Sequence, residues 1–128
     1  MLEWGKVDPS LLDPSFRKDV ETFLGNSPYR WWVSYGYRSL QEQADLYAKY
    51  QAGGPRAAPA GRSAHNFGLA VDVVLDGSEN PGTQADWDTS HPGWKWLTEA
   101  CLHHPTLHSG ARYADYGHIE LASWDKHS

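Results

Sequence analysis

A charged residue inside an apolar strand is the feature that most constrains this chain. Val71 to Leu75 is a predicted strand, and Asp72 lies within it. Burying a lone carboxylate is costly, and a metal ion would compensate for that cost. His65 precedes Asp72 by seven residues, which span about 23 Å when extended, whereas donor atoms on one zinc ion lie about 3–4 Å apart. The chain between them must therefore fold back, which Gly68 permits because glycine tolerates a positive φ.

The remainder of this predicted site lies near the C-terminus, in the segment from Asp115 to Glu120. His118 is the predicted third ligand. Asp115 precedes it by three residues and would reach a water at an open position of the metal. Two histidines and one carboxylate with one vacant position are typical of catalytic zinc rather than of a closed structural site.

These residues carry a family resemblance. The pattern Ser-x-His-x-x-Gly-x-Ala-x-Asp, present as Ser63, His65, Gly68, Ala70 and Asp72, is followed far downstream by Asp-x-x-His. The combination resembles the LAS-type zinc metallopeptidases, which include D-Ala-D-Ala carboxypeptidases and dipeptidases and the L-alanyl-D-glutamate endopeptidases of bacteria and phages.

The resemblance extends over nearly the whole chain and is strongest to the endopeptidase branch, which includes phage endolysins. The run from His65 to Val74 resembles that branch, as does the upstream stretch Gly36-Tyr37-Arg38-Ser39 with Gln43 and Leu46-Tyr47. One departure surrounds the last histidine, where the family usually has proline before and an aromatic residue after. This chain has Gly117 and Ile119.

The sequence pattern predicts an α+β fold with a small, mostly antiparallel sheet and helices packed against it. The resemblance implies that this is the Hedgehog/D-Ala-D-Ala peptidase fold. It also implies zinc on His65, Asp72 and His118, which would activate water for amide hydrolysis, with Asp115 as general acid–base. The expected substrate is the peptidoglycan stem peptide, cut between L-Ala and D-Glu. Two alternatives are a D-Ala-D-Ala carboxypeptidase or dipeptidase, and a non-catalytic zinc-bearing wall-binding module.

Three further residues are predicted to contribute to the site. Arg38 ends a predicted strand, at its junction with the next helix, and would contact the oxyanion or a substrate carboxylate; the alternative is a surface ion pair with Glu42. Ser63 would bind substrate or orient the site, or it is only a turn residue. Glu120 shares a strand face with His118 and would orient that ligand; a solvent-exposed glutamate is equally compatible with the pattern.

The predicted elements follow from capping residues and periodicity. Helices are expected after Asp8, after Asp13 (with Phe16, Val20, Phe23 and Leu24 inward), after Ser39 (with Leu40, Ala44 and Tyr47 on one face), and after Ser90 (with Trp94, Leu97, Ala100 and Cys101 inward). Strands are expected at 31–38, 69–75, 111–114 and 118–122, with a turn at 115–117.

Two loops separate these elements. The first, 53–62, is rich in Gly, Pro and Ala, and the second, 76–89, is polar. Acidic residues in the second, Asp76, Glu79, Asp86 and Asp88, do not match the spacing of an EF-hand, so a solvated loop is favoured over a calcium site. The remaining histidines, His91, His103, His104, His108 and His127, have no metal-ligand spacing and are predicted to be surface or helix-end residues.

Length and composition narrow the remaining possibilities. The 128 residues fit one catalytic domain, 1–128, without a separate wall-binding domain. A net charge of −5 argues against nucleic-acid binding. No stretch is apolar enough to span a membrane, and the N-terminus lacks the features of a signal peptide. We therefore expect a protein made in the cytoplasm, and we expect it to be a monomer. The resemblance to phage endolysins implies that it reaches the wall after holin-type release.

The chain is also rich in aromatic residues, with seven Trp and seven Tyr. Some of them should pack in the core. The surplus could line a groove that binds a peptide or a glycan.

Overall fold

The computed structural model describes residues 2–77, 85–111 and 115–127 of the chain. Its sheet has the strand order β1-β2-β3-β6-β5, and β4 pairs separately with β3. The strands are β1 (Leu2–Glu3), β2 (Trp31–Tyr35), β3 (Ala70–Asp76), β4 (Ala85–Asp86), β5 (Leu107–Gly110) and β6 (Asp115–Leu121). Only the β1–β2 pair is parallel among these described strands. The α+β architecture with a mostly antiparallel sheet is therefore confirmed.

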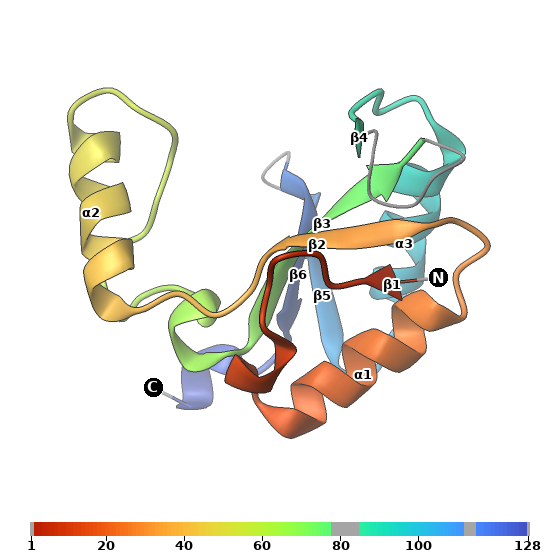
Figure 1. Cartoon of the computed structure of the whole chain (residues 1–128), viewed down its shortest axis with the longest axis horizontal. Coiled ribbons are helices and arrows are strands. Elements are labelled where there is room, and N and C mark those ends of the chain that lie inside the picture. The colour runs from red at the N-terminus through yellow and green to blue at the C-terminus, as the bar shows by residue number, and fades with distance from the viewer. Residues whose placement is uncertain (1, 78–84, 112–114, 128) are drawn as a thin grey trace.

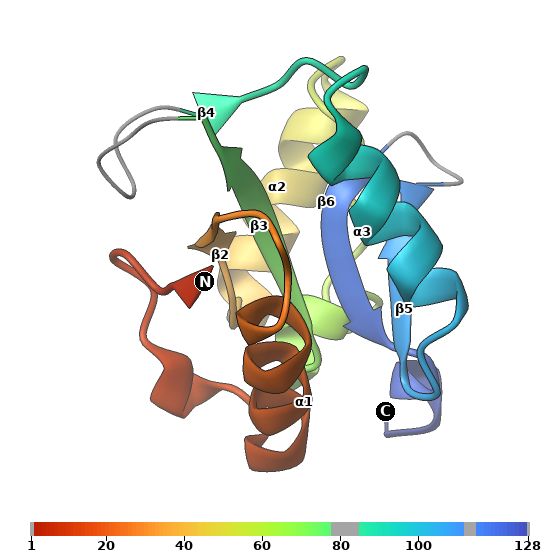
Figure 2. The same cartoon turned by 90° about the vertical axis from the view of Figure 1, so that its right-hand side faces the viewer.

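The helices surround this sheet unevenly. They are α1 (Pro14–Gly25), α2 (Leu40–Gln51) and α3 (Pro92–Leu102), with the 3-10 turns η1 (Pro9–Leu11), η2 (Ala64–Phe67) and η4 (Trp124–His127). Figure 1 shows α1 and α3 on one side of the sheet and α2 standing apart at the opposite end. Figure 2, in which α1 lies in front of the lower part of β3 and α3 in front of β6 and β5, agrees with this arrangement. None of the helices in the described ranges is long and apolar enough to cross a membrane.

The core forms between the sheet and the two helices that cover it. Its buried residues include Phe16, Val20 and Leu24 from α1, Trp94, Leu97 and Cys101 from α3, and Trp31, Val71, Val73, Leu107 and Ile119 from the strands. The apolar stripes predicted for the first and last helices are thus the faces that pack. Burial raises the pKa of the Cys101 thiol to about 12, which fits a packed core residue rather than a reactive one.

Helix α2 differs from the prediction. Ser39 and Glu42 form the expected capping box, but the predicted apolar face is not buried, and Leu40 is 58% exposed. The buried residue of this helix is instead Gln43. The reason is positional, because α2 stands away from the sheet and its apolar side chains find no core to enter.

Several predicted boundaries were also wrong. The strand at 31–38 ends at Tyr35, after a bulge, and the last helix is capped by His91 instead of Ser90. The predicted turn at 115–117 belongs to β6, and a strand that the sequence did not predict lies at 107–110. Residues 112–114 of that prediction, and 78–84 of the polar loop including Glu79, lie outside the described ranges.

Candidate metal centre

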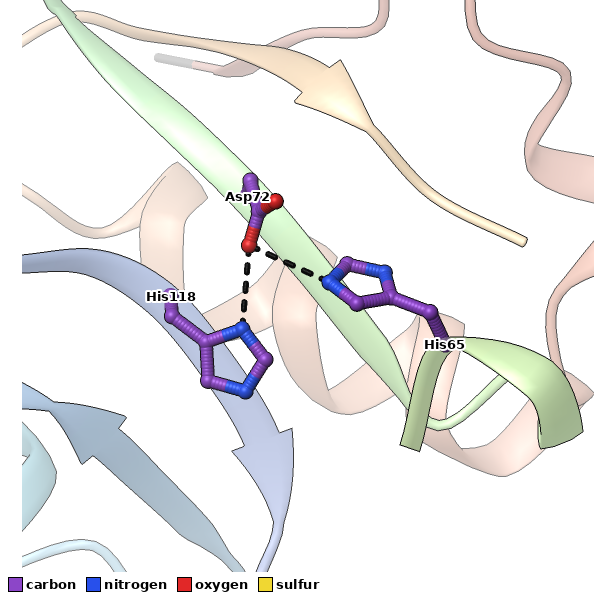
Figure 3. A group of neighbouring side chains, drawn as sticks. All are labelled: His65, Asp72 and His118. Carbon is purple, nitrogen blue, oxygen red and sulfur yellow. Dashed lines mark hydrogen bonds and ion pairs between the residues drawn. The ribbon is translucent and has the colours of Figure 1, made fainter. Parts of the chain in front are cut away.

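Three predicted ligands meet at one point, although they come from three different elements. His65 lies in η2, Asp72 in β3 and His118 in β6. One donor atom from each side chain lies within 4.8 Å of the other two. Figure 3 shows both imidazole rings directed at the Asp72 carboxylate, whose Oδ1 lies 3.2 Å from His65 Nε2 and 3.0 Å from His118 Nδ1.

The turn between His65 and Asp72 is the fold-back that the sequence predicts. Gly68 ends η2 with a φ of 67°, in the left-handed region. A Cβ at this position would lie 3.0 Å from the backbone nitrogen of Asp13, so a side chain would also clash with the segment that starts α1. Ser63 caps the same turn, because its Oγ accepts from the His65 backbone N–H at 3.3 Å.

The other two ligands are paired by strand register. Asp72 and His118 are direct partners in the antiparallel β3–β6 pair, a position in which side chains on the same face lie close together. Gly117 permits this approach, since a Cβ there would lie 2.3 Å from the Val73 carbonyl oxygen. The glycine that departs from the family pattern is therefore required by the packing of this sheet.

Each histidine is held by its second ring nitrogen. His65 is buried, and its Nδ1 lies 2.7 Å from the Gly36 carbonyl oxygen, to which it donates. His118 Nε2 donates to Glu120 Oε1 at 2.7 Å. These bonds leave His65 Nε2 and His118 Nδ1 directed at Asp72, which is how proteins orient histidine ligands of a metal. Glu120 thus contacts His118, and its role in orienting a metal ligand stays a prediction.

The pKa values in the group reflect these short contacts. Burial disfavours the Asp72 carboxylate, but hydrogen bonds from His118 and His65 outweigh it and hold the pKa of Asp72 well below its ordinary value. Burial likewise disfavours the His118 cation, yet the bonds to Asp72 and Glu120 raise the pKa of His118 to about 10. In this group, protons on the imidazoles stabilise the Asp72 carboxylate. A divalent cation could take the place of those protons.

The donor set fits zinc. Two imidazole nitrogens and one carboxylate oxygen match the ligands of catalytic zinc sites, which keep a fourth position open. Donor separations of 3.0 and 3.2 Å also match the spacing of about 3–4 Å expected around one ion with bonds near 2.0–2.2 Å. When bound, zinc would polarise a carbonyl oxygen and lower the pKa of a coordinated water.

Asp115 lies beside this group and does not belong to it. Partial desolvation and the charge of Asp72 raise the pKa of Asp115, with His118 and His65 opposing the shift. A carboxylate whose pKa moves toward neutrality suits a general base.

Two hollows adjoin the metal group, and Asp115 lines both. The larger, of about 780 Å³, also has His118 and Glu120 in its walls. The smaller, of about 340 Å³, has Asp72. Each hollow therefore has one predicted metal ligand in its wall, and Asp115 is common to both.

Arg38 is fixed by a buried amide that sequence reasoning assigned no role. Its Nη1 donates to Gln43 Oε1 at 3.1 Å, and its guanidinium lies 5.6 Å from the centre of the Tyr35 ring. Gln43, 1% exposed, donates in turn to the Ala58 carbonyl at 2.7 Å. The Arg38 guanidinium thus donates to Gln43, while Glu42 caps α2. A polar residue in the middle of a predicted apolar helix face was the available signal for this role.

Other predicted residues lie outside the metal group. Ser63 acts on the turn that carries His65, and its contact with substrate stays a prediction. His91 and His104 accept backbone N–H bonds at the ends of α3, as expected of helix-end residues. Asp88 bonds to Ser90, and the described residues of the polar loop form no metal cluster.

Comparison with known proteins places the chain in a family. A family model described as VanY, D-alanyl-D-alanine carboxypeptidase, matches residues 26–109. This range contains His65 and Asp72 but ends before Asp115 and His118. His118 is brought to the site by the β3–β6 register described above.

Solved structures share the fold at low identity. An L-Ala D-Glu endopeptidase, ChiX, from Serratia marcescens is 19% identical with a TM-score of 0.69, over 100% of this chain and 95% of its own. A D,D-pentapeptidase, VanY, from a VanB-type resistance cassette, in complex with Zn(II), is 18% identical with a TM-score of 0.61, over 89% and 74%. DacB from Streptococcus pneumoniae is 20% identical with a TM-score of 0.59, over 93% and 72%.

The family match covers most of the chain, and the described fold is that of these peptidases. The side chains of His65, Asp72 and His118 fit a zinc ion. The chain belongs to the VanY family of zinc metallopeptidases.

Proposed function

We propose that this protein is a peptidoglycan endopeptidase that hydrolyses the stem peptide at the L-Ala–D-Glu bond. The observation that carries this proposal is the pair of hollows beside the metal group. An endopeptidase must accommodate substrate on both sides of the scissile bond, whereas a carboxypeptidase needs a site that is closed beyond the terminal residue. The similarity to the endopeptidase ChiX across the whole chain supports the same choice.

In this proposal the side chains divide the work of amide hydrolysis. His65, Asp72 and His118 hold zinc, and Glu120 keeps the His118 ring in place. Asp115, between the two hollows, takes a proton from the attacking water and returns it to the leaving amine. Arg38, held by Gln43, stabilises negative charge on the carbonyl oxygen or binds a carboxylate of the substrate.

A second candidate is hydrolysis of a terminal D-Ala-D-Ala bond. It is favoured by the family model, whose description is D-alanyl-D-alanine carboxypeptidase, and by a VanY structure in complex with D-alanine-D-alanine. Both reactions use the same metal ligands and the same base. They differ in how far the substrate extends on the far side of the scissile bond.

Product analysis on purified muropeptides distinguishes these candidates. Cleavage at L-Ala–D-Glu yields a peptide with a new N-terminal D-Glu, whereas a carboxypeptidase releases free D-Ala and a dipeptidase consumes D-Ala-D-Ala. Mass spectrometry after incubation with the zinc-loaded protein identifies each product. Release of D-Ala without any N-terminal D-Glu peptide would overturn the endopeptidase proposal.

We further propose that the enzyme is bacteriolytic and acts as a phage-type endolysin. Support comes from the resemblance of the run His65 to Val74 to the branch that contains endolysins. Loss of turbidity in a wall suspension, abolished by a chelator and restored by zinc, is the expected result. A stable suspension despite bound zinc would favour the non-catalytic wall-binding alternative.

A further inference from the structure

The smaller hollow has an aromatic wall that the catalytic mechanism does not use. Beside Asp72 and Asp115, it is lined by Tyr35, Trp87, Trp94 and Tyr116. Two of these rings are largely exposed, Trp87 at 65% and Tyr35 at 60%. Exposed aromatic rings gathered at a concave site are costly in water and mark binding surfaces.

Trp87 is held in a fixed position rather than lying loosely on the surface. Its ring stacks on Trp94 with centroids 5.9 Å apart and planes 14° apart. Trp94 is buried, donates from Nε1 to the Asp86 carbonyl at 3.0 Å, and packs edge-on against the buried Trp31 at 5.3 Å. The exposed indole is therefore the outer end of a stack that is anchored in the core.

The backbone next to Trp87 is also anchored. Asp86 belongs to β4 and pairs with Leu75 of β3, the strand that carries Asp72. Figure 1 shows β4 at the end of β3 next to the start of α3. Trp87, through the adjoining β4, and the metal ligand Asp72 are thus both positioned by β3.

The larger hollow has a different chemistry. Its walls include the basic residues Arg56 and His108 together with the ligand His118 and Glu120. A guanidinium beside a peptide-binding site suits carboxylates, and the stem peptide is rich in carboxylates on the D-Glu side of the scissile bond. On the other side, L-Ala is joined to the lactyl group of N-acetylmuramic acid, so a sugar lies one residue away.

We infer that the smaller hollow is a saccharide subsite, in which Trp87 stacks against the apolar face of an N-acetylated amino sugar of the glycan strand. The volume of about 340 Å³ lies within the range of small-molecule sites, about 300–1,000 Å³. The peptide then runs past the metal group into the larger hollow. This inference rests on the proposed cleavage at L-Ala–D-Glu, because that bond lies nearer the sugar than the terminal D-Ala-D-Ala bond of the second candidate function.

Paired substrates test the subsite. One is N-acetylmuramoyl-L-Ala-D-isoGln-L-Lys, and the other is the same peptide with an acetyl group in place of the sugar. We expect wild type to cleave the muramoyl peptide with the higher kcat/KM. In Trp87→Ala the ratio of the two kcat/KM values should fall about 3- to 10-fold, as loss of one aromatic contact predicts. Trp87→Phe should retain most of the preference.

Tyr50→Ala is the matched control, since Tyr50 is an exposed aromatic residue on α2 and lines neither hollow. Its ratio should equal that of wild type. The inference is overturned if wild type shows no preference, or if Trp87→Ala impairs both substrates equally, which would indicate a pocket for an apolar peptide side chain.

Failure of the proposed function gives a different result, in which neither substrate is cut after L-Ala. In that case, calorimetry measures the affinity of the zinc-loaded protein for N-acetylmuramoyl-L-Ala-D-isoGln, which tests the subsite without cleavage. Binding that is weakened by Trp87→Ala and kept by Tyr50→Ala supports the saccharide subsite, and binding that is unchanged by Trp87→Ala overturns it.

Discussion

Asp72 and His118 face each other across two antiparallel strands, and His118 Nδ1 lies 3.0 Å from Asp72 Oδ1. They are separated by 46 positions in the sequence, and the strand register alone brings them together. His65 completes the group from the turn that precedes β3. Because each ligand comes from a different element, the metal should link the folded elements and its loss should affect stability as well as activity.

We predict that His65→Ala loses zinc and activity together. His65 supplies one of three donors, and its ring is buried. Since zinc that binds only the folded state stabilises it, the Tm of wild type should fall on chelation, whereas the Tm of the variant should not respond to chelator. Elemental analysis and thermal denaturation measure both effects. Full activity in a preparation with little zinc would contradict the metal assignment.

Asp115→Asn should separate catalysis from metal binding. The substitution keeps the shape of the side chain and removes its basicity, so hydrolysis should fall about 10²–10⁴-fold. Zinc content and Tm should stay near wild type, because Asp115 stands outside the ligand group. Peptide cleavage and zinc content are measured on the same preparation. Near-normal cleavage would remove Asp115 from the role of base.

Glu120→Gln tests whether this carboxylate orients His118. Replacing the charged acceptor of the 2.7 Å bond should weaken zinc binding about 10–100-fold, as is usual for such partners of metal ligands. Glu99→Gln is the control, since Glu99 is an exposed carboxylate on α3 that pairs with Lys95. Competition with a chromophoric chelator gives both affinities. Equal affinities in the two variants would indicate that Glu120 is only a neighbour.

Arg38→Ala should lower kcat and kcat/KM together, by about 10²–10³-fold, if the guanidinium stabilises the oxyanion. Zinc content should be unaffected. If Arg38 binds a substrate carboxylate instead, KM alone should rise. Gln43→Ala should change the same kinetic parameter by a smaller factor, because Gln43 acts through the position of the guanidinium. An Arg38→Ala variant with wild-type kinetics would return Arg38 to a surface role.

The stability of the zinc-free protein should depend on pH through His118. Its folded pKa of about 10 lies above the ordinary value of 6.5, so the stabilisation is fully present below pH 6.5 and is lost as pH rises through 10. The Asp72 contribution has the opposite sign: it is present above the ordinary value of 3.8 and is lost as pH falls toward the lowered pKa.

Thermal melts of chelator-treated protein between pH 5 and about pH 10 measure this dependence. As pH rises through the alkaline part of the range, the Tm of wild type should fall more than the Tm of His118→Asn, which lacks the titrating ring. Parallel curves for the two proteins would contradict the shift. Zinc binding should release a proton from His118 and weaken as pH falls, because the ligand nitrogen must be unprotonated.

Much of this site is determined by local sequence. The capping residues Asp13 and Ser39 start their helices where predicted because a cap depends on residues only a few positions apart. The same holds for the turn at Gly68, whose positive φ is a local requirement. The burial of Val71 and Val73 with Asp72 on the opposite face follows from strand alternation. The local settings of His65 and Asp72 were predictable for this reason, whereas the pairing of Asp72 with His118 depends on the register of β3 and β6.

Other features depend on contacts between segments distant in sequence, and only the tertiary structure decided them. Gly117, predicted to be in a turn, lies in a strand because β6 passes against the Val73 carbonyl. Leu40 is exposed and Gln43 buried because α2 stands away from the sheet. The hollows on the two sides of Asp115 arise where strands, helix and loop meet. Periodicity shows which face of an element is apolar, but the packing partner determines whether that face is covered.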